Sequence, residues 1–405
     1  MRAGTNPSPR IIATSALDRL YQIDNPAELK ECLNAFLTAV KGSFRTLSKK
    51  DEDALIAIVT TGDKPISPEL YQRYADNFRR AVDAVPIDDI DLSAQWHANV
   101  SRFAAYKAYH ATEELRRIAE EEDGDMAFLR ATLHKYNRYQ AAEYNTAVAR
   151  ARTGKQWQQF DEPDNRRLFP CIKWLPSRSA TPREEHMPFY NRVWPKDDPF
   201  WTYNQPGTLW NCKCDWEQTD EDPTDGNPDR RIVKPGLDQN PATSGQIFTD
   251  TAAYIKKAPR STEPICRTIC RDYSRQVADT LSKGVTCRIG EETHSVDFSN
   301  AKANKHFAQD CFKDDIYWVK NEVLLNPQPF LDEAELVGRK LSDTTHNTNR
   351  ETKKLKAKTD YFYYYKITFS KGQELYLHLG RYEKTGNMYL YSASVKPPKN
   401  MEPLQ

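Results

Sequence analysis

Two cysteines one residue apart give the clearest chemical signal in this chain. Cys212 and Cys214 lie at the end of residues 190–216, a stretch that also holds four tryptophans. Thiolates at this spacing can chelate a transition metal, although structural zinc usually takes a second pair of ligands. His186 and Cys171 could supply the remaining ligands. The alternative, which we adopt from the sequence, is that the thiols are buried beside tryptophans. The sequence then predicts no metal and no cofactor.

Length and charge define the broad class of protein. A chain of 405 residues should hold two or three domains. It has 58 basic and 57 acidic side chains, so no overall field draws it to nucleic acid or to a membrane. No apolar run approaches the roughly 18–20 residues that span a bilayer, and the first residues lack the apolar core of a secretory signal. Eight cysteines are too sparse for a disulfide framework. We therefore expect synthesis inside a cell and no membrane partner.

Helical signals dominate the first 154 residues. The longest helix is expected from about 92 to 121, and Asp123-Gly124 should break it. The next helix is expected to run to about Thr153-Gly154, where the composition changes. Capping sequences predict further helix starts at Asn25-Pro26, Ser48 and Ser67-Pro68.

After residue 245 the pattern becomes a mixture of helix and strand. A helix is expected at 266–283 and another at 305–318. Five strand-like runs are present, and the last three suggest an antiparallel meander with a helix on one face: 285–289, 294–298, 361–369, 375–379 and 389–395. The sequence thus predicts an α+β multidomain chain, with a mainly helical N-terminal half, an irregular Trp/Pro-rich end to that half, and a small α+β C-terminal domain. The expected boundaries are a helical region 1–64, a domain 65–220, a linker 221–245 and a domain 246–405.

The order of motifs in residues 65–220 resembles the phage minor head proteins of the Mu F class. That family has an Arg-x-x-His element, matched by Arg183 to His186, and an Asp-Asp-Pro-Phe-Trp motif, matched by residues 197–201. A Trp-x-Cys-x-Cys motif follows and is matched by residues 210–214. The helix containing Tyr144 to Arg150 resembles the family's Asn/Thr-Ala-Arg helix.

This resemblance implies a minor capsid protein that acts in head morphogenesis. Its expected partners are the phage portal and major capsid proteins. Its expected location is the virion, and the cytoplasm of the host bacterium during assembly. Nothing in the composition indicates this role, which rests on the motifs.

The C-terminal domain resembles another group, the small ribonuclease toxins of the barnase, EndoU, colicin and RelE kind. The resemblance rests on a helix with a histidine, His306, then Lys320-Asn321 before two leucines, and a late Tyr391-Ser392 strand. It implies metal-independent endoribonuclease activity, with RNA as a further partner.

Metal-free RNA cleavage needs a base, an acid and a cation for the pentacovalent phosphate. His306 is the expected base or acid, and His378 offers a second imidazole. Lys320 or Arg381 could bind phosphate, while Tyr391 could donate a proton or stack on a base. A basic run at 353–358 would suit an RNA backbone.

Each of these residues also has a structural interpretation. A histidine on a mixed helix or strand is commonly a surface residue, and a tyrosine on a sheet is commonly part of the core. Two alternatives to an appended ribonuclease therefore remain open. One is a purely structural head protein whose C-terminal domain is an interaction module, and the other is a polymorphic toxin that uses the head domain for delivery.

Overall fold

The chain is of the predicted α+β class and divides into two compact units. The structure is a computed structural model that describes residues 48–281, 284–298, 319–345, 350–369 and 372–402. Unit 1 takes its described residues from 48–86 and 110–238, and unit 2 takes them from 87–109 and from 239 onward. Each unit therefore combines segments that are distant in sequence, whereas the boundaries expected at 64, 220 and 245 run in chain order.

The first helices of unit 1 begin at the predicted caps. In α3 (Lys49–Thr61) the Ser48 hydroxyl accepts from the backbone N–H of Asp51, and in α4 (Pro68–Asp83) the Ser67 hydroxyl accepts from that of Leu70. These bonds satisfy backbone donors that the first turn of a helix leaves unpaired. The third predicted cap, Asn25-Pro26, lies outside the described residues, as does the helix expected at 305–318.

Two long helices follow, and one of them ends later than its sequence suggests. α5 covers Ile90–Glu121 and α6 covers Met126–Asp161, with Asp123 and Gly124 at positive φ between them. Gly154 does not end α6, as the sequence predicted, but lies buried inside it. The helix continues because Trp157 and Phe160 in its last turns pack on Trp216, with ring centroids 5.7 Å away in both cases. Burying two aromatic rings outweighs the roughly 1 kcal/mol that a glycine costs inside a helix.

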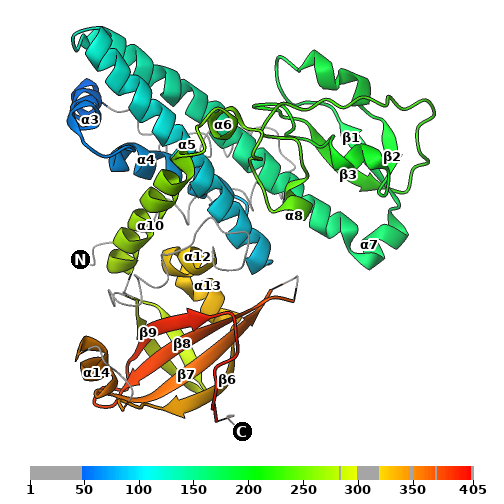
Figure 1. The fold of residues 1–405 in the computed structure, drawn as a ribbon. Coiled ribbons are helices and arrows are strands. Elements are labelled where there is room, and N and C mark those ends of the chain that lie inside the picture. The colour runs from blue at the N-terminus through cyan, green and yellow to red at the C-terminus, as the bar shows by residue number, and fades with distance from the viewer. Residues whose placement is uncertain (1–47, 282–283, 299–318, 346–349, 370–371, 403–405) are drawn as a thin grey trace, which may run out of the picture. The chain divides into compact units, whose positions relative to one another are not determined.

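The Trp/Pro-rich region forms a small sheet around an aromatic core. Strands β1 (Cys171–Leu175), β2 (Val193–Pro195) and β3 (Asp215–Thr219) pair antiparallel in the order β2-β1-β3 (Figure 1). The short helix α7 (Pro163–Leu168) precedes β1, while the 3-10 helices η1 (Glu184–Phe189) and η2 (Pro199–Thr202) lie between β1 and β2 and between β2 and β3. Residues 190–216, which lack a regular period, thus hold two short strands and a single 3-10 turn. The buried tryptophans of this aromatic core are Trp174, Trp194, Trp201 and Trp216.

The predicted linker begins as a strap along unit 1. The backbone N–H of Thr224 donates to the carbonyl of Val193, and that of Lys234 donates to the carbonyl of Thr208, at 3.0 and 2.9 Å. Asn204 holds the same strap, because its side chain accepts from the N–H of Ile232 at 2.8 Å. Residues 221–238 are therefore docked on unit 1.

Unit 2 contains a six-stranded sheet in the order β4-β5-β9-β8-β7-β6 (Figure 1). The strands are β4 (Thr286–Ile289), β5 (Glu292–Asp297), β6 (Glu335–Leu341), β7 (Thr359–Thr368), β8 (Glu374–Tyr382) and β9 (Met388–Ser394). Its helices, besides the start of α5, are α8 (Pro241–Ser244), α9 (Ala253–Lys256), α10 (Thr262–Leu281), α12 (Val319–Leu325), α13 (Pro327–Asp332) and α14 (Arg350–Lys356).

The two faces of this sheet bury different side chains. Leu377, Leu379 and Leu390 face a core that also contains residues of α12 and α13. Tyr364 and Tyr389 belong to a second, smaller cluster, to which Leu355 of α14 contributes. The predicted hairpins are present, but β5 pairs with β9 in parallel, so the sheet is mixed. Pairing between distant strands is a tertiary choice that alternation within one strand does not encode.

Candidate functional site

His186 is the buried centre of the predicted ligand set. It lies in η1, is fully buried, and meets the Trp174 ring edge-on at 5.1 Å between centroids. Its Nδ1 is 3.5 Å from the sulfur of Cys212 and 3.5 Å from that of Cys214. Its Nε2 is 3.5 Å from Thr208 Oγ1. The imidazole thus directs one nitrogen at two thiols and the other at a hydroxyl.

The loop that presents the cysteines is held from two directions. Asn211 has a φ of 59°, a left-handed conformation that asparagine tolerates, and its N–H donates to Thr146 Oγ1 of α6 at 2.7 Å. From the other direction, Arg183 Nη2 donates to the carbonyl of Trp210 at 2.8 Å. Both named residues of the Arg-x-x-His element, Arg183 and His186, therefore meet the Cys-x-Cys loop.

The two thiols are coupled. A hydrogen bond from Cys214 lowers the pKa of Cys212 below that of a free thiol although the residue is buried. The same bond raises the pKa of Cys214 well above that of a free thiol. The backbone N–H of Cys214 also lies 3.4 Å from the sulfur of Cys212 and donates to it. Of the two, Cys212 is therefore the more acidic thiol.

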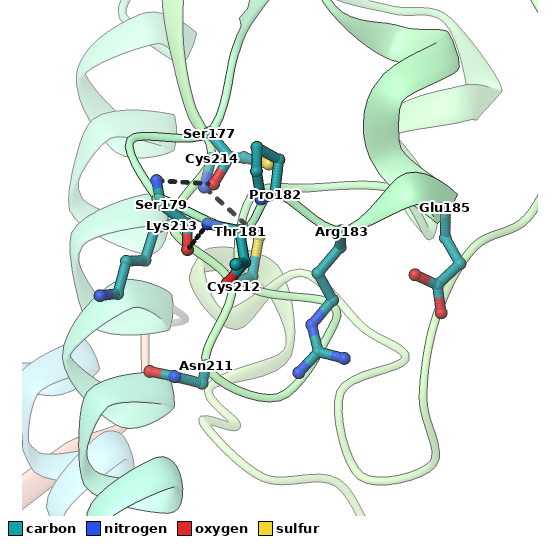
Figure 2. A pocket seen from close by; sticks show the side chains of 10 residues that line it. All are labelled: Ser177, Ser179, Thr181, Pro182, Arg183, Glu185, Asn211, Cys212, Lys213 and Cys214. Atoms are coloured by element: carbon teal, nitrogen blue, oxygen red, sulfur yellow. Dashed lines mark hydrogen bonds between the residues drawn. The ribbon is translucent and has the colours of Figure 1, made fainter.

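A cavity of about 350 Å³ opens beside these sulfurs. Figure 2 shows Cys212 and Cys214 with Pro182 and Arg183 on the neighbouring segment, while the side chain of Lys213 points away from both cysteines. Glu185 contributes a carboxylate to the lining. The cavity is thus lined by polar groups and by both cysteines, and His186 is not among its lining residues.

Cys171, the fourth residue of the predicted ligand set, lies elsewhere in unit 1. It pairs with Thr219, whereas Leu175 at the other end of β1 pairs with Asp215, the neighbour of Cys214. Four residues of extended strand span about 13 Å, which is too far for a shared ion. The cluster therefore has three members, whose ligand atoms all lie within 4.8 Å of one another: His186, Cys212 and Cys214.

In unit 2 the predicted catalytic residues lie on two faces of the sheet. His378 meets the Tyr364 ring edge-on at 4.9 Å, and Tyr391 lies against the Phe362 ring at 4.8 Å, on the face of the smaller cluster. Lys320 belongs to α12, which packs on the opposite, leucine-rich face. His306 lies outside the described residues.

Both predicted phosphate-binding cations already have partners in the fold. The buried ammonium of Lys320 donates to the carbonyl of Ala393 at 3.2 Å. Arg381 forms a two-point ion pair with Asp360, at 2.9 and 2.6 Å to one carboxylate oxygen. This pairing raises the pKa of Arg381 above that of a free guanidinium.

His378 itself is held by two hydroxyls of β9. Ser392 Oγ lies 2.8 Å from its Nδ1, and Ser394 Oγ lies 3.0 Å from its Nε2. Ser394 donates its own proton to the carbonyl of Lys396 at 2.7 Å, so it accepts from the imidazole. Nδ1 is then an acceptor for Ser392. Burial also raises the pKa of Tyr391 on this face.

No protein-family model, curated protein or solved structure matches the chain. In the part of the chain that the structure describes, no helix combines the length and the apolar character needed to cross a membrane. The resemblances therefore rest on the motifs quoted above.

Proposed function

We propose that the chain is a minor head protein of a phage or prophage and acts in head morphogenesis by binding portal and capsid proteins. The supporting observation is the convergence of its three motifs. Arg183 and His186 meet the Cys212–Cys214 loop. Trp201, from the Asp-Asp-Pro-Phe-Trp motif, stacks parallel to Trp174, which contacts His186. Motifs that meet in one core are parts of a single folded module, which supports a family relationship over chance matches.

Unit 1 also carries the exposed apolar side chains expected of a protein-binding surface. Of the seven large hydrophobic side chains that are exposed among the described residues, six belong to unit 1. Phe128 and Tyr139 on α6 are 51% and 45% exposed. They are eleven residues apart, which is about three helical turns, so they lie on the same side of α6. Exposed aromatic side chains on one face favour a protein partner.

The proposal is tested on purified particles. Quantitative mass spectrometry of proheads and virions should find the chain in a few copies per head, and its absence from both would overturn the proposal. Phe128→Glu with Tyr139→Glu should reduce incorporation at least about tenfold, because both charges enter an apolar interface. Leu341→Glu is the matched control, since Leu341 is 60% exposed but belongs to unit 2.

A second candidate function is RNA cleavage by unit 2. It is favoured by the position of His378 and Tyr391, which lie on the sheet face of the smaller cluster, to which α14 also contributes. On α14, Lys353 and Lys354 are exposed. An imidazole, a phenol and nearby ammonium groups are suitable for binding and cleaving RNA. The interaction-module alternative is favoured because both cations bind partners within the fold. Lys320 donates to the carbonyl of Ala393, and Arg381 pairs with Asp360.

Incubation of the full chain with total RNA separates these alternatives. The ribonuclease hypothesis expects cleavage that is lost in His306→Ala and reduced at least about a hundredfold in His378→Ala, the range typical for removing a general acid or base. His134→Ala, an exposed histidine of unit 1, should change nothing. If the wild-type chain leaves RNA intact, the ribonuclease hypothesis fails and the head-protein proposal stands unchanged.

A further inference from the structure

We infer that His186, Cys212 and Cys214 bind a zinc ion, with its fourth coordination position facing the polar cavity. This site goes beyond the proposed function and does not depend on it. It replaces the expectation from the sequence that the thiols are simply buried beside tryptophans and that no metal is bound.

The distances within the cluster are those of a zinc coordination sphere. Zinc lies about 2.3 Å from a thiolate sulfur and about 2.0–2.1 Å from an imidazole nitrogen, with near-tetrahedral angles. Those values place sulfur and nitrogen about 3.6 Å apart. Nδ1 of His186 lies 3.5 Å from each of the two sulfurs. The two nitrogen–sulfur distances therefore need almost no change to receive the ion, and all three ligand atoms lie within 4.8 Å of one another.

The tautomer of His186 is the one that leaves Nδ1 free to bind a metal. Thr208 has one hydroxyl proton, which it donates to the carbonyl of Gln205 at 2.9 Å or to that of Ile232 at 3.2 Å. Toward His186 Nε2 it can then only accept, so Nε2 carries the imidazole proton. Metal-binding histidines commonly donate their second ring nitrogen in this way, which fixes both ring orientation and tautomer.

The charges also balance in the buried site. Two thiolates neutralise a divalent ion, so the loaded site carries no net charge beside the aromatic core. The backbone N–H of Cys214, 3.4 Å from the sulfur of Cys212, would also donate to that thiolate in the loaded site. Thiolate and imidazole together select zinc over magnesium or calcium, which take oxygen ligands.

The fourth position is exchangeable, since no fourth protein ligand stands at the cluster. Among the described residues, the histidine, cysteine and carboxylate groups that come together here are only these three. Tyr190 Oη lies 4.0 Å from Cys214 Sγ, and Cys171 lies at the far end of β1. Cys212 and Cys214 line the cavity, whereas His186 is not part of its wall. Three protein ligands with one open position can hold a water molecule or an incoming ligand.

The ion would connect two segments of unit 1. His186 lies in η1, and the cysteines lie just before β3. These segments are 26 residues apart and otherwise meet through Arg183 and the carbonyl of Trp210. A zinc bond at this point fixes the path of the intervening tryptophan-rich chain.

Elemental analysis of the full chain, purified under reducing conditions from zinc-supplemented cells, tests the inference directly. The expected content is about one zinc per chain. Cys212→Ser and His186→Asn should each lower it at least about tenfold. Cys171→Ser is the matched control and should keep it, because Cys171 is also a buried thiol of unit 1 but lies outside the cluster.

Cobalt substitution provides a readout that does not depend on how the variants fold. Cobalt added to metal-free wild-type chain should give the visible bands of a four-coordinate ion and a sulfur-to-cobalt charge-transfer band. Added imidazole should shift the visible bands, because it displaces the water at the open position. A wild-type chain that binds neither metal, a zinc content unchanged by Cys212→Ser, or a Cys212–Cys214 disulfide in the reduced preparation would each overturn the site. Visible bands that imidazole leaves unchanged would overturn the open position.

Discussion

Thr208 accepts a hydrogen bond from His186 Nε2 while donating its own proton to a backbone carbonyl. Thr208 is fully buried. The pair sets the imidazole with Nδ1 toward the thiols of Cys212 and Cys214. A residue that touches no sulfur thus determines which nitrogen can bind a metal.

Replacing this hydroxyl should weaken metal binding without removing a ligand. Thr208→Val keeps the shape of the side chain but leaves Nε2–H without an acceptor, and loss of such a partner typically costs about 10–100-fold in metal affinity. Thr208→Ser keeps the hydroxyl and should bind zinc within about threefold of wild type. Competition with a chromophoric chelator measures both affinities. Equal affinities for the valine and serine variants would contradict the assigned tautomer.

Gly380 leaves room for the ring of Tyr389 on the neighbouring strand. A Cβ at position 380 would stand 2.4 Å from Cζ and 2.5 Å from Oη of Tyr389. The ring is fixed from its far end, because its hydroxyl lies 2.7 Å from that of Thr359. Gly380→Ala should therefore destabilise unit 2 by about 1–3 kcal/mol, the usual range for overpacking a core.

Urea unfolding of a double-mutant cycle checks this prediction. Tyr389→Leu alone loses packing, but in that background Gly380→Ala should cost much less, because the ring that it would overlap is gone. A Gly380→Ala cost that is the same in both backgrounds would show that the overlap with Tyr389 is not its cause.

Local signals in the sequence predicted helix starts well, because capping is a contact between near neighbours. Ser48 and Ser67 act through backbone groups three residues away, so their effect is contained in the sequence. The predicted end of α6 was wrong because the helix continues past Gly154 through a contact with Trp216, some sixty residues later. Spacing alone could not supply that contact.

The candidate site shows the same division between local and distant information. Cys-x-Cys chemistry is visible as a local pair, and His186 was a reasonable third ligand. From the sequence, Cys171 was as good a candidate ligand as His186. Only the register of β1 with β3 shows that Cys171 lies about 13 Å from the Cys212–Cys214 loop. Thr208 gave no signal, because a threonine becomes significant only when a histidine lies beside it. Arg381 was predicted to bind phosphate because of its bidentate fork. Its pairing with Asp360 could not be predicted, because Asp360 lies on a different strand.

Lys196 should make the stability of unit 1 depend on pH. Its buried ammonium donates to the carbonyls of Phe160 and Asn165 at 2.6 and 3.1 Å, and burial lowers its pKa to about 8. Between this value and the ordinary 10.5, the unfolded chain holds a proton that the folded chain has released. The free energy of unfolding attributable to Lys196 therefore rises with pH across that window and is constant below it.

Lys196→Met should abolish this rise and cost about 1–3 kcal/mol at neutral pH, because two buried carbonyls lose their donor. Urea unfolding at about pH 7.5 and about pH 9.5 measures both effects. Lys173→Met is a useful control, because the hydrogen bond to Glu221 raises the pKa of Lys173. The free energy of unfolding attributable to Lys173 therefore changes only above pH 10.5, where it decreases as the pH rises. A slope retained in Lys196→Met would assign the pH dependence to another group.

The first part of α5 should be required for unit 2 to fold. Asn99 forms two hydrogen bonds with the backbone of Phe248, donating to its carbonyl at 2.9 Å and accepting from its N–H at 2.8 Å. Phe103 stacks on the Phe248 ring with centroids 4.1 Å apart, and Trp96 Nε1 donates to the carbonyl of Pro241 at 3.0 Å. These contacts join two segments about 150 residues apart, and a fragment that begins at 246 lacks all of the first segment.

A fragment of residues 246–405, the domain expected from the sequence, should therefore show no cooperative unfolding transition by circular dichroism. Co-expression with residues 87–109 and extension of the fragment to begin at 239 should restore the transition. In the full chain, Asn99→Ala should cost about 1–3 kcal/mol, because both backbone groups of Phe248 lose a partner. A fragment 246–405 that unfolds as cooperatively as the full chain would show that residues 87–109 are dispensable, and the unit would then follow the sequence order after all.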